Sequence, residues 1–175
     1  MLRLVGVDDQ QRRWLLKNPG HIWGIDDLLE LFPDALVVQT HRDPAEAIPS
    51  VCRVLELPQG IYLGDNVRPE LIGPAEAAKW RAGVDRTQRA RARCPDNFHD
   101  VSIAEFRRNP IAVIDGIYTR IGLSLSREVE SAMRRWLDEQ PKESRQGVTP
   151  PPERYGLSVA GLRELFADYI QTHSL

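Results

Sequence analysis

Apolar residues fall into short blocks along the first third of the chain, and the blocks have the lengths of strands and helices. Residues 14–17 form a short apolar run before Asn-Pro-Gly, a sequence typical of a turn. Over 22–32 the apolar positions recur every three or four residues, which predicts a helix. A second run at 35–39 predicts a strand parallel to the first, because a helix joins the two. The predicted fold class is therefore α/β, with a three-layer parallel sheet flanked by helices.

The rest of the chain continues this alternation, with more helix than strand. Its predicted elements are a helix over 44–56, a loop over 57–74, a helix over 75–93, a strand over 98–102, helices that begin at Pro110 and after Ser126, a proline-rich link over 140–156 and a terminal helix over 158–170. The sequence shows no internal repeat, and its length suits one core. We therefore interpret residues 1–175 as a single domain.

Composition excludes several classes of protein. The formal net charge of −2 does not favour binding of nucleic acid through bulk charge. No apolar run approaches the roughly 20 residues that cross a bilayer, and Asp8 and Asp9 interrupt any signal-peptide pattern. Cys52 and Cys94 have neither metal-ligand spacing nor a disulfide framework. We expect a cytoplasmic protein that needs no metal.

Polar side chains follow the first two predicted strands at the point where each strand ends. Lys17 and His21 come after the first strand, and His41 and Arg42 come after the second. Because residues just past the carboxyl ends of strands line the ligand crevice of an α/β sheet, these cations predict an anion site. We interpret His41 as a packing or positioning residue, and His173 carries no signal in the sequence.

The spacing of Arg42 and Ser50 sharpens the prediction of an anion site. Asp43 is the expected N-cap of the next helix, and Pro44 suits its first position. Ser50 then lies about two turns into that helix, where an arginine fork and a hydroxyl can meet one phosphate. Arg42 could instead pair with Asp43 or Glu46, and the sequence leaves that alternative open.

Three motifs in this region resemble one known family. They are K-x-P-x-H at 17–21, F-P-D-A at 32–35 and H-R-D-P at 41–44. Together they resemble the sulfotransferases that use 3′-phosphoadenylyl sulfate, in particular their bacterial branch. The resemblance is strong over 12–56, is continuous to about residue 139 and is loose beyond that point.

The resemblance implies a P-loop-NTPase-like sheet and a donor site. In this family an arginine at the end of the second strand and a serine eight residues later hold the 3′-phosphate of the donor. Arg42 and Ser50 match these positions. A basic, glycine-containing segment near the end of the family's chain closes over the donor, and Arg145 and Gly147 match it faintly. The implied co-substrate is 3′-phosphoadenylyl sulfate, without a metal.

The resemblance also implies the catalytic roles. The family's lysine at the first strand end assists the departing phosphate, and Lys17 matches it. A nearby histidine or glutamate accepts the proton of the acceptor, and His21 is the nearest candidate. Lys17 could instead be an ordinary cation at a strand end, and His21 could simply cap the following helix. The implied partner is a small-molecule hydroxyl or amine acceptor of unknown identity.

One part of the family pattern does not occur within these 175 residues. Family members hold the 5′-phosphosulfate with a strand and a basic Gly/Ser/Thr loop, and no such loop precedes Trp14. We therefore expect the C-terminal portion of a sulfotransferase, weakly active or inactive as given. A non-catalytic nucleotide-binding remnant or subunit stays open, and so does a homodimer. A kinase-like nucleotide-binding enzyme is a third alternative, although no G-x-x-x-x-G-K-[ST] motif supports it.

Overall fold

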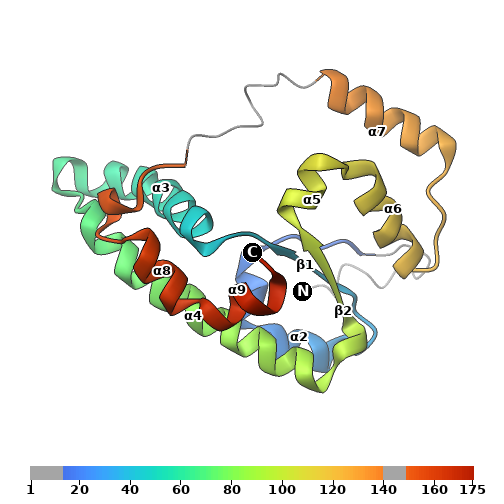
Figure 1. Ribbon diagram of the computed structural model, residues 1–175, viewed down its shortest axis with the longest axis horizontal. Helices are drawn as coiled ribbons and strands as arrows, with labels where there is room; N and C mark the ends of the chain where they lie inside the picture. The colour runs from blue at the N-terminus through green and yellow to red at the C-terminus, as the bar shows by residue number, and fades with distance from the viewer. Residues whose placement is uncertain (1–13, 140–148) are drawn as a thin grey trace.

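The computed structural model describes residues 14–139 and 149–175, which form two short strands and a larger set of helices (Figure 1). The elements, with η for a 3-10 helix, are η1 (Pro19–Trp23), α2 (Ile25–Leu31), β1 (Val37–His41), α3 (Pro44–Leu63), η2 (Gly64–Asn66), α4 (Pro69–Arg93), η3 (Pro95–Asn97), β2 (Phe98–Ser102), α5 (Ile103–Arg108), α6 (Pro110–Arg120), α7 (Arg127–Glu139), η5 (Pro152–Tyr155), α8 (Val159–Leu165) and α9 (Ala167–His173).

The two strands pair in parallel, in a register that runs from Val37 opposite Phe98 to His41 opposite Ser102. The strand predicted over 98–102 is confirmed, and the strand before it begins later than the sequence suggested. Because both strands run in the same direction, His41 and Ser102 lie at the same edge of the sheet. This is the edge at which α/β proteins bind ligands.

The strand predicted over 14–17 is wrong, and so is its pairing with β1. This segment has irregular backbone and exposed side chains, with Leu15 94% exposed. Asn18 starts η1 directly afterwards, because its side chain accepts a hydrogen bond from the Gly20 N–H. A short apolar run becomes a strand only where a neighbouring strand and other elements bury it. Among the described residues, the parallel neighbour of β1 is β2.

Helices cover the sheet on both sides, which gives three layers (Figure 1). On one side α2 and α4 pack against the strands, and Ile25, Leu29, Ala90 and Phe98 form a buried cluster there. On the other side α5 and α6 contact β2. A second cluster joins α3, α4, η5, α8 and α9 beyond the end of the sheet. The predicted α/β class is therefore confirmed.

The loop predicted over 57–74 is also wrong, because α3 continues to Leu63 and α4 already begins at Pro69. Pro58 stands inside α3 and Pro74 inside α4. An interior proline removes one backbone donor and usually kinks or ends a helix. Here α3 and α4 pack against each other along the hairpin, and that packing maintains helical backbone through the prolines.

The predicted terminal helix is helical but consists of two short helices, α8 and α9, that meet at Phe166. Ser158 caps α8, since its hydroxyl accepts the Gly161 N–H at 3.1 Å. Leu162, Phe166 and Tyr169 are buried in the second cluster. The last two helices therefore belong to the core, and α9 ends near the carboxyl end of β1.

Candidate functional site

The carboxyl end of β1 leads directly into α3, and this junction carries the residues that the sequence singled out. His41 is the last residue of the strand, and Arg42 and Asp43 connect it to the helix. Asp43 is the N-cap, as predicted, because its Oδ1 accepts the Ala45 N–H at 2.8 Å. Pro44 occupies the first helical position, where its missing N–H costs nothing. The strand and the capped helix together fix the backbone on both sides of Arg42.

Arg42 reaches two acceptors from this junction. Its Nε donates to Glu46 Oε2 at 2.9 Å, and its Nη2 donates to Thr149 Oγ1 at 3.3 Å. The pairing with Glu46 that the sequence left open therefore occurs. The Arg42 side chain is still 27% exposed, so part of its guanidinium faces solvent.

Ser50 lies in α3 and is half-buried. It stands about two turns into the helix, whereas Arg42 precedes the N-cap Asp43 and so lies outside the helix. Arg53 follows Ser50 by three residues, and residues at that spacing are neighbours on a helix surface. That Arg42 and Ser50 hold one phosphate stays a prediction.

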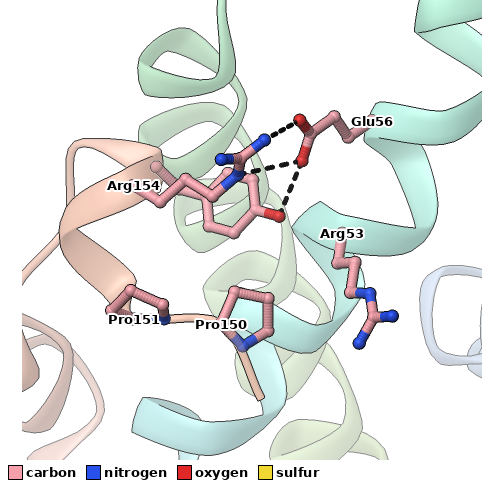
Figure 2. A pocket seen from close by; sticks show the side chains of 6 residues that line it. Arg53, Glu56, Pro150, Pro151 and Arg154 are labelled. Carbon is pink, nitrogen blue, oxygen red and sulfur yellow. Dashed lines mark hydrogen bonds and ion pairs between the residues drawn. The ribbon is translucent and has the colours of Figure 1, made fainter. Parts of the chain in front are cut away.

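A cavity of about 420 Å³ lies against the same helix (Figure 2). Its lining residues are Arg53 and Glu56 of α3 and Pro150, Pro151, Arg154 and Tyr155 of the segment after the predicted link. The two proline rings provide apolar walls, and Figure 2 shows the Arg53 side chain extending past Pro150. The sequence did not single out this cavity, because it depends on a contact between distant segments.

Three of the residues that line the cavity are joined by hydrogen bonds. Glu56 accepts from Tyr155 Oη at 2.9 Å and from the Arg154 guanidinium (Figure 2). The bond from Arg154 is the main reason why the pKa of Glu56 is lowered. Tyr155 is fully buried, so the described part of the predicted 140–156 link is packed into the core.

Lys17 and His21 lie just before and within η1, outside the junction of β1 and α3. Lys17 is exposed and His21 is half-buried at the start of η1. That helix is attached to α4, because Trp23 packs on Trp80 with ring centroids 4.9 Å apart. Within the described ranges, no hydrogen bond or ion pair joins Lys17 or His21 to the Arg42 junction. Arg145 and Gly147 lie outside the described residues.

His41 is buried, with 3% of its surface exposed, and both ring nitrogens have partners. Nδ1 lies 3.0 Å from Tyr169 Oη, and Nε2 lies 2.8 Å from Asp100 Oδ1. The ring also stacks on His173, with centroids 3.7 Å apart and planes 17° apart. The interpretation of His41 as a positioning or packing residue agrees with this burial, and His173, which carries no signal in the sequence, is its stacking partner. No local signal could have found the contact, since Tyr169 lies 128 residues from His41 in sequence.

Asp100 links this histidine to α4. Its two carboxylate oxygens accept from Arg91 at 2.8 and 2.6 Å, and the hydrogen bonds from Arg91 and His41 outweigh burial and lower the pKa of Asp100. Burial lowers the pKa of His41, although Asp100 opposes that change. Burial and the neighbouring His41 charge lower the pKa of His173. Both rings therefore favour the neutral form.

The same cluster has some features of a metal site. His41, Asp100 and His173 place candidate ligand atoms within 4.8 Å of one another. Arg91, however, occupies both oxygens of Asp100, and its positive charge opposes a cation at that point. Nearly parallel stacked rings also direct their nitrogen lone pairs alongside each other rather than toward one ion. We therefore describe the cluster as a hydrogen-bonded network.

Comparisons with known proteins agree with the family that the motifs resemble. A profile of the Sulfotransferase family matches residues 1–127. The crystal structure of sulfotransferase STF9 from Mycobacterium avium is 34% identical, with a TM-score of 0.81, over 91% of this chain and 41% of that protein. Sulfotransferase STF1 from Mycobacterium tuberculosis H37Rv is 34% identical, with a TM-score of 0.72, over 95% of this chain and 42% of that protein. A search of curated proteins finds no significant match.

The chain belongs to the sulfotransferase family and has the fold of the bacterial members just described. It spans about two fifths of the length of those two proteins. Members of this family generally use 3′-phosphoadenylyl sulfate as donor and act on small-molecule acceptors. Within the described ranges, no helix is long and apolar enough to cross a membrane.

Proposed function

We propose that this chain provides the donor-binding region of a cytoplasmic sulfotransferase and holds the 3′-phosphate of 3′-phosphoadenylyl sulfate with Arg42 and Ser50. One observation carries the proposal. Arg42 directly follows the carboxyl end of β1, and Ser50 lies about two turns into α3, the helix that begins two residues after Arg42. They also match the arginine and serine that hold this phosphate in the family that the chain belongs to.

Arg42 is suited to this role by its chemistry and its present contacts. A guanidinium offers parallel N–H donors to two phosphate oxygens, and charge-assisted bonds of this kind are the strong ones. Its current acceptors, Glu46 and Thr149, are a surface carboxylate and a hydroxyl that phosphate oxygens can replace. Thr149 follows Gly147 by two residues, which supports a contribution of Arg145 and Gly147 to the same phosphate.

Lys17 and His21 would carry out the transfer step. The acceptor oxygen or nitrogen attacks sulfur in line, the bond between sulfur and the bridging phosphate oxygen breaks, and adenosine 3′,5′-bisphosphate leaves. Lys17 stabilises the negative charge that develops on the bridging oxygen, and His21 accepts the proton that the acceptor loses. The acceptor is a small hydroxyl or amine compound.

Binding and transfer should be separable in this chain. The family's cradle for the 5′-phosphosulfate does not occur within the 175 residues. Since positioning and electrostatic preorganisation provide most of the rate, we expect little or no transfer by these residues alone. Donor binding through the 3′-phosphate should persist.

Calorimetry with adenosine 3′,5′-bisphosphate tests the proposal. Arg42→Ala should weaken binding by about 1.5–3 kcal/mol, the usual worth of a hydrogen bond to a charged group. Arg135→Ala removes the same charge from the exposed surface of α7 and should leave the affinity unchanged. A transfer assay with a phenol or alcohol acceptor accompanies the titration. Equal affinity in wild type and Arg42→Ala would remove Arg42 from the site, and robust transfer would show a donor cradle built from other residues.

A further inference from the structure

Residues 41–43 are held from one side by the last two helices of the chain, which we call the C-terminal pair (α8 and α9). Tyr169 and His173 of α9 contact His41, and Arg163 of α8 contacts Asp43. The residue between these two contacts is Arg42. We propose that Tyr169, His173 and Arg163 are positioning residues that hold Arg42 for the donor phosphate, and that protonation of the His41–His173 stack releases this hold. The inference rests on the proposed function of Arg42.

The contact with Asp43 fixes the helix side of the junction. Arg163 Nη2 donates to Asp43 Oδ2 at 2.7 Å, while Asp43 Oδ1 caps α3. One carboxylate therefore joins the start of α3 to α8. The Arg163 side chain is 59% exposed, so this ion pair alone is weak. Its importance lies in its place beside Arg42.

The contact with His41 fixes the strand side. Tyr169 Oη meets His41 Nδ1, and the ring of His173 covers the imidazole face. The backbone N–H of Arg42 also interacts with the phenol of Tyr169, which partly opposes the rise that burial causes in its pKa. Burial of Tyr169 in the main core cluster makes α9 a rigid support. The backbone of residues 41–42 is therefore set by a helix that ends at the carboxyl terminus of this chain.

Protonation of His41 or His173 would weaken the contact between their stacked rings. The titratable and charged groups that face the stack are Asp100 of β2, Arg91 of α4 and Tyr169 of α9. Asp100 favours a proton on His41, but Arg91 already neutralises that carboxylate with two hydrogen bonds. Two imidazolium rings with centroids 3.7 Å apart would repel each other strongly. The docked arrangement therefore accepts fewer protons than the undocked one.

The sign of the pH effect follows from the lowered pKa values of both histidines. Well above the ordinary histidine pKa of about 6.5, both rings are neutral in either arrangement, and docking is unopposed. As the pH falls below that value, the undocked form takes up protons that the docked form resists. Affinity for the bisphosphate should then fall by up to about tenfold per pH unit for each extra proton.

The test is the pH profile of affinity for adenosine 3′,5′-bisphosphate, measured by calorimetry from pH 7.5 to 5.5. His173→Phe preserves an aromatic ring over His41 and removes the titrating group. His99→Gln is the matched control, because His99 is a histidine of β2 outside the stack. The phosphates of the ligand titrate identically in all three proteins. We expect the wild type and His99→Gln to lose affinity together, and His173→Phe to retain at least several-fold more of its affinity at pH 5.5.

Two further variants separate the positioning of Arg42 from the overall stability of the protein. Tyr169→Phe preserves the buried ring but loses the bond to His41, and it should weaken binding at pH 7.5 by several-fold. Arg163→Gln should weaken binding at every pH, without changing the pH step. The urea midpoint of each variant shows whether it is folded under the titration conditions.

The outcomes distinguish this inference from the proposed function. Wild-type binding with an identical pH step in His173→Phe overturns the inference and leaves the function of Arg42 intact. Unchanged affinity at pH 7.5 in both Tyr169→Phe and Arg163→Gln also overturns it. No binding by the folded wild type at pH 7.5 overturns the proposed function, and the inference with it.

Discussion

The two halves of α3 differ sharply in how much of their apolar surface is buried. In the first half Pro44, Ala45, Ile48, Pro49 and Cys52 are buried. In the second half the large apolar residues face solvent, with Val54 69%, Leu57 74% and Ile61 78% exposed. Both halves have apolar residues at helical spacing. The difference therefore comes from what packs against the helix.

Three elements that come later in the sequence pack against α3. Helix α4, η5 and α8 all contact α3, whereas the end of the α3–α4 hairpin projects away from the rest of the fold (Figure 1). The Arg42 junction lies at the start of the packed half. A residue that must hold a phosphate needs a fixed backbone, and burial of the helix behind it supplies that.

The largest expected effect comes from truncating the same residue type in each half. Ile48→Ala removes a side chain that is 4% exposed, and it should lower the free energy of unfolding by about 2–5 kcal/mol. Ile61→Ala removes one that is 78% exposed and should change it by less than about 0.5 kcal/mol. Urea denaturation measures both. Similar losses in the two variants would mean that the second half is also covered.

The next largest effect tests how closely η5 packs against α4. A Cβ on Gly73 of α4 would lie 2.0 Å from the carbonyl oxygen of Tyr155, so η5 would have to move. Gly73→Ala should therefore destabilise the protein by about 1–3 kcal/mol. Gly116 of α6 has open space around it, and Gly116→Ala should stabilise by up to about 1 kcal/mol through helix propensity. A stabilising Gly73→Ala would show that η5 does not seat against α4 in this way.

A smaller effect is expected at the cap of the packed half. Asp43→Ala removes both the cap bond to Ala45 and the pair with Arg163, and it should cost about 0.5–2 kcal/mol. Asp43→Asn preserves a cap acceptor and loses only the charge, so it should cost less. Thermal unfolding of both variants compares the contribution of the cap bond with that of the ion pair. An equal loss in the two would assign the whole effect to the ion pair.

The smallest effect is the pH dependence of unfolding in the absence of ligand. Burial lowers the pKa values of His41 and His173, so the folded state binds fewer protons than the unfolded state. Stability should hold above about pH 6.5 and fall below it, by at most about 1.4 kcal/mol per pH unit per proton. Asp100, whose pKa is lowered, adds its own loss only at more acidic pH. His173→Phe should flatten the profile between pH 6.5 and 5, and an unchanged profile would show that the stack does not titrate there.

The sequence predicted the elements whose signals are local. The cap at Asp43, the strand over 98–102 and the helix that follows Pro44 all depend on neighbouring residues, and all are confirmed. The strand at 14–17 was wrong because a four-residue apolar run reads alike whether or not a neighbour buries it. The loop over 57–74 was wrong because prolines and glycines were weighted above the packing of two long helices.

The sequence could propose a site only within one segment. Arg42 and Ser50 lie eight residues apart around the start of α3, and their joint role in binding a phosphate stays a prediction. The contacts of His173 with His41 and of Arg154 with Glu56 join the last 25 residues to the first third of the chain. No periodicity or spacing encodes such contacts, so only the fold shows that the C-terminal pair contacts the residues on either side of Arg42.

The most direct test of the account compares two nucleotides that differ only in the 3′-phosphate. Calorimetry should show that the wild type binds adenosine 3′,5′-bisphosphate at least about tenfold more tightly than adenosine 5′-monophosphate, which corresponds to roughly 1.4 kcal/mol or more from contacts to that phosphate. In Arg42→Ala this preference should largely disappear, while the affinity for the monophosphate stays the same. Equal affinity of the wild type for the two nucleotides would contradict the claim that Arg42 and Ser50 form a 3′-phosphate site.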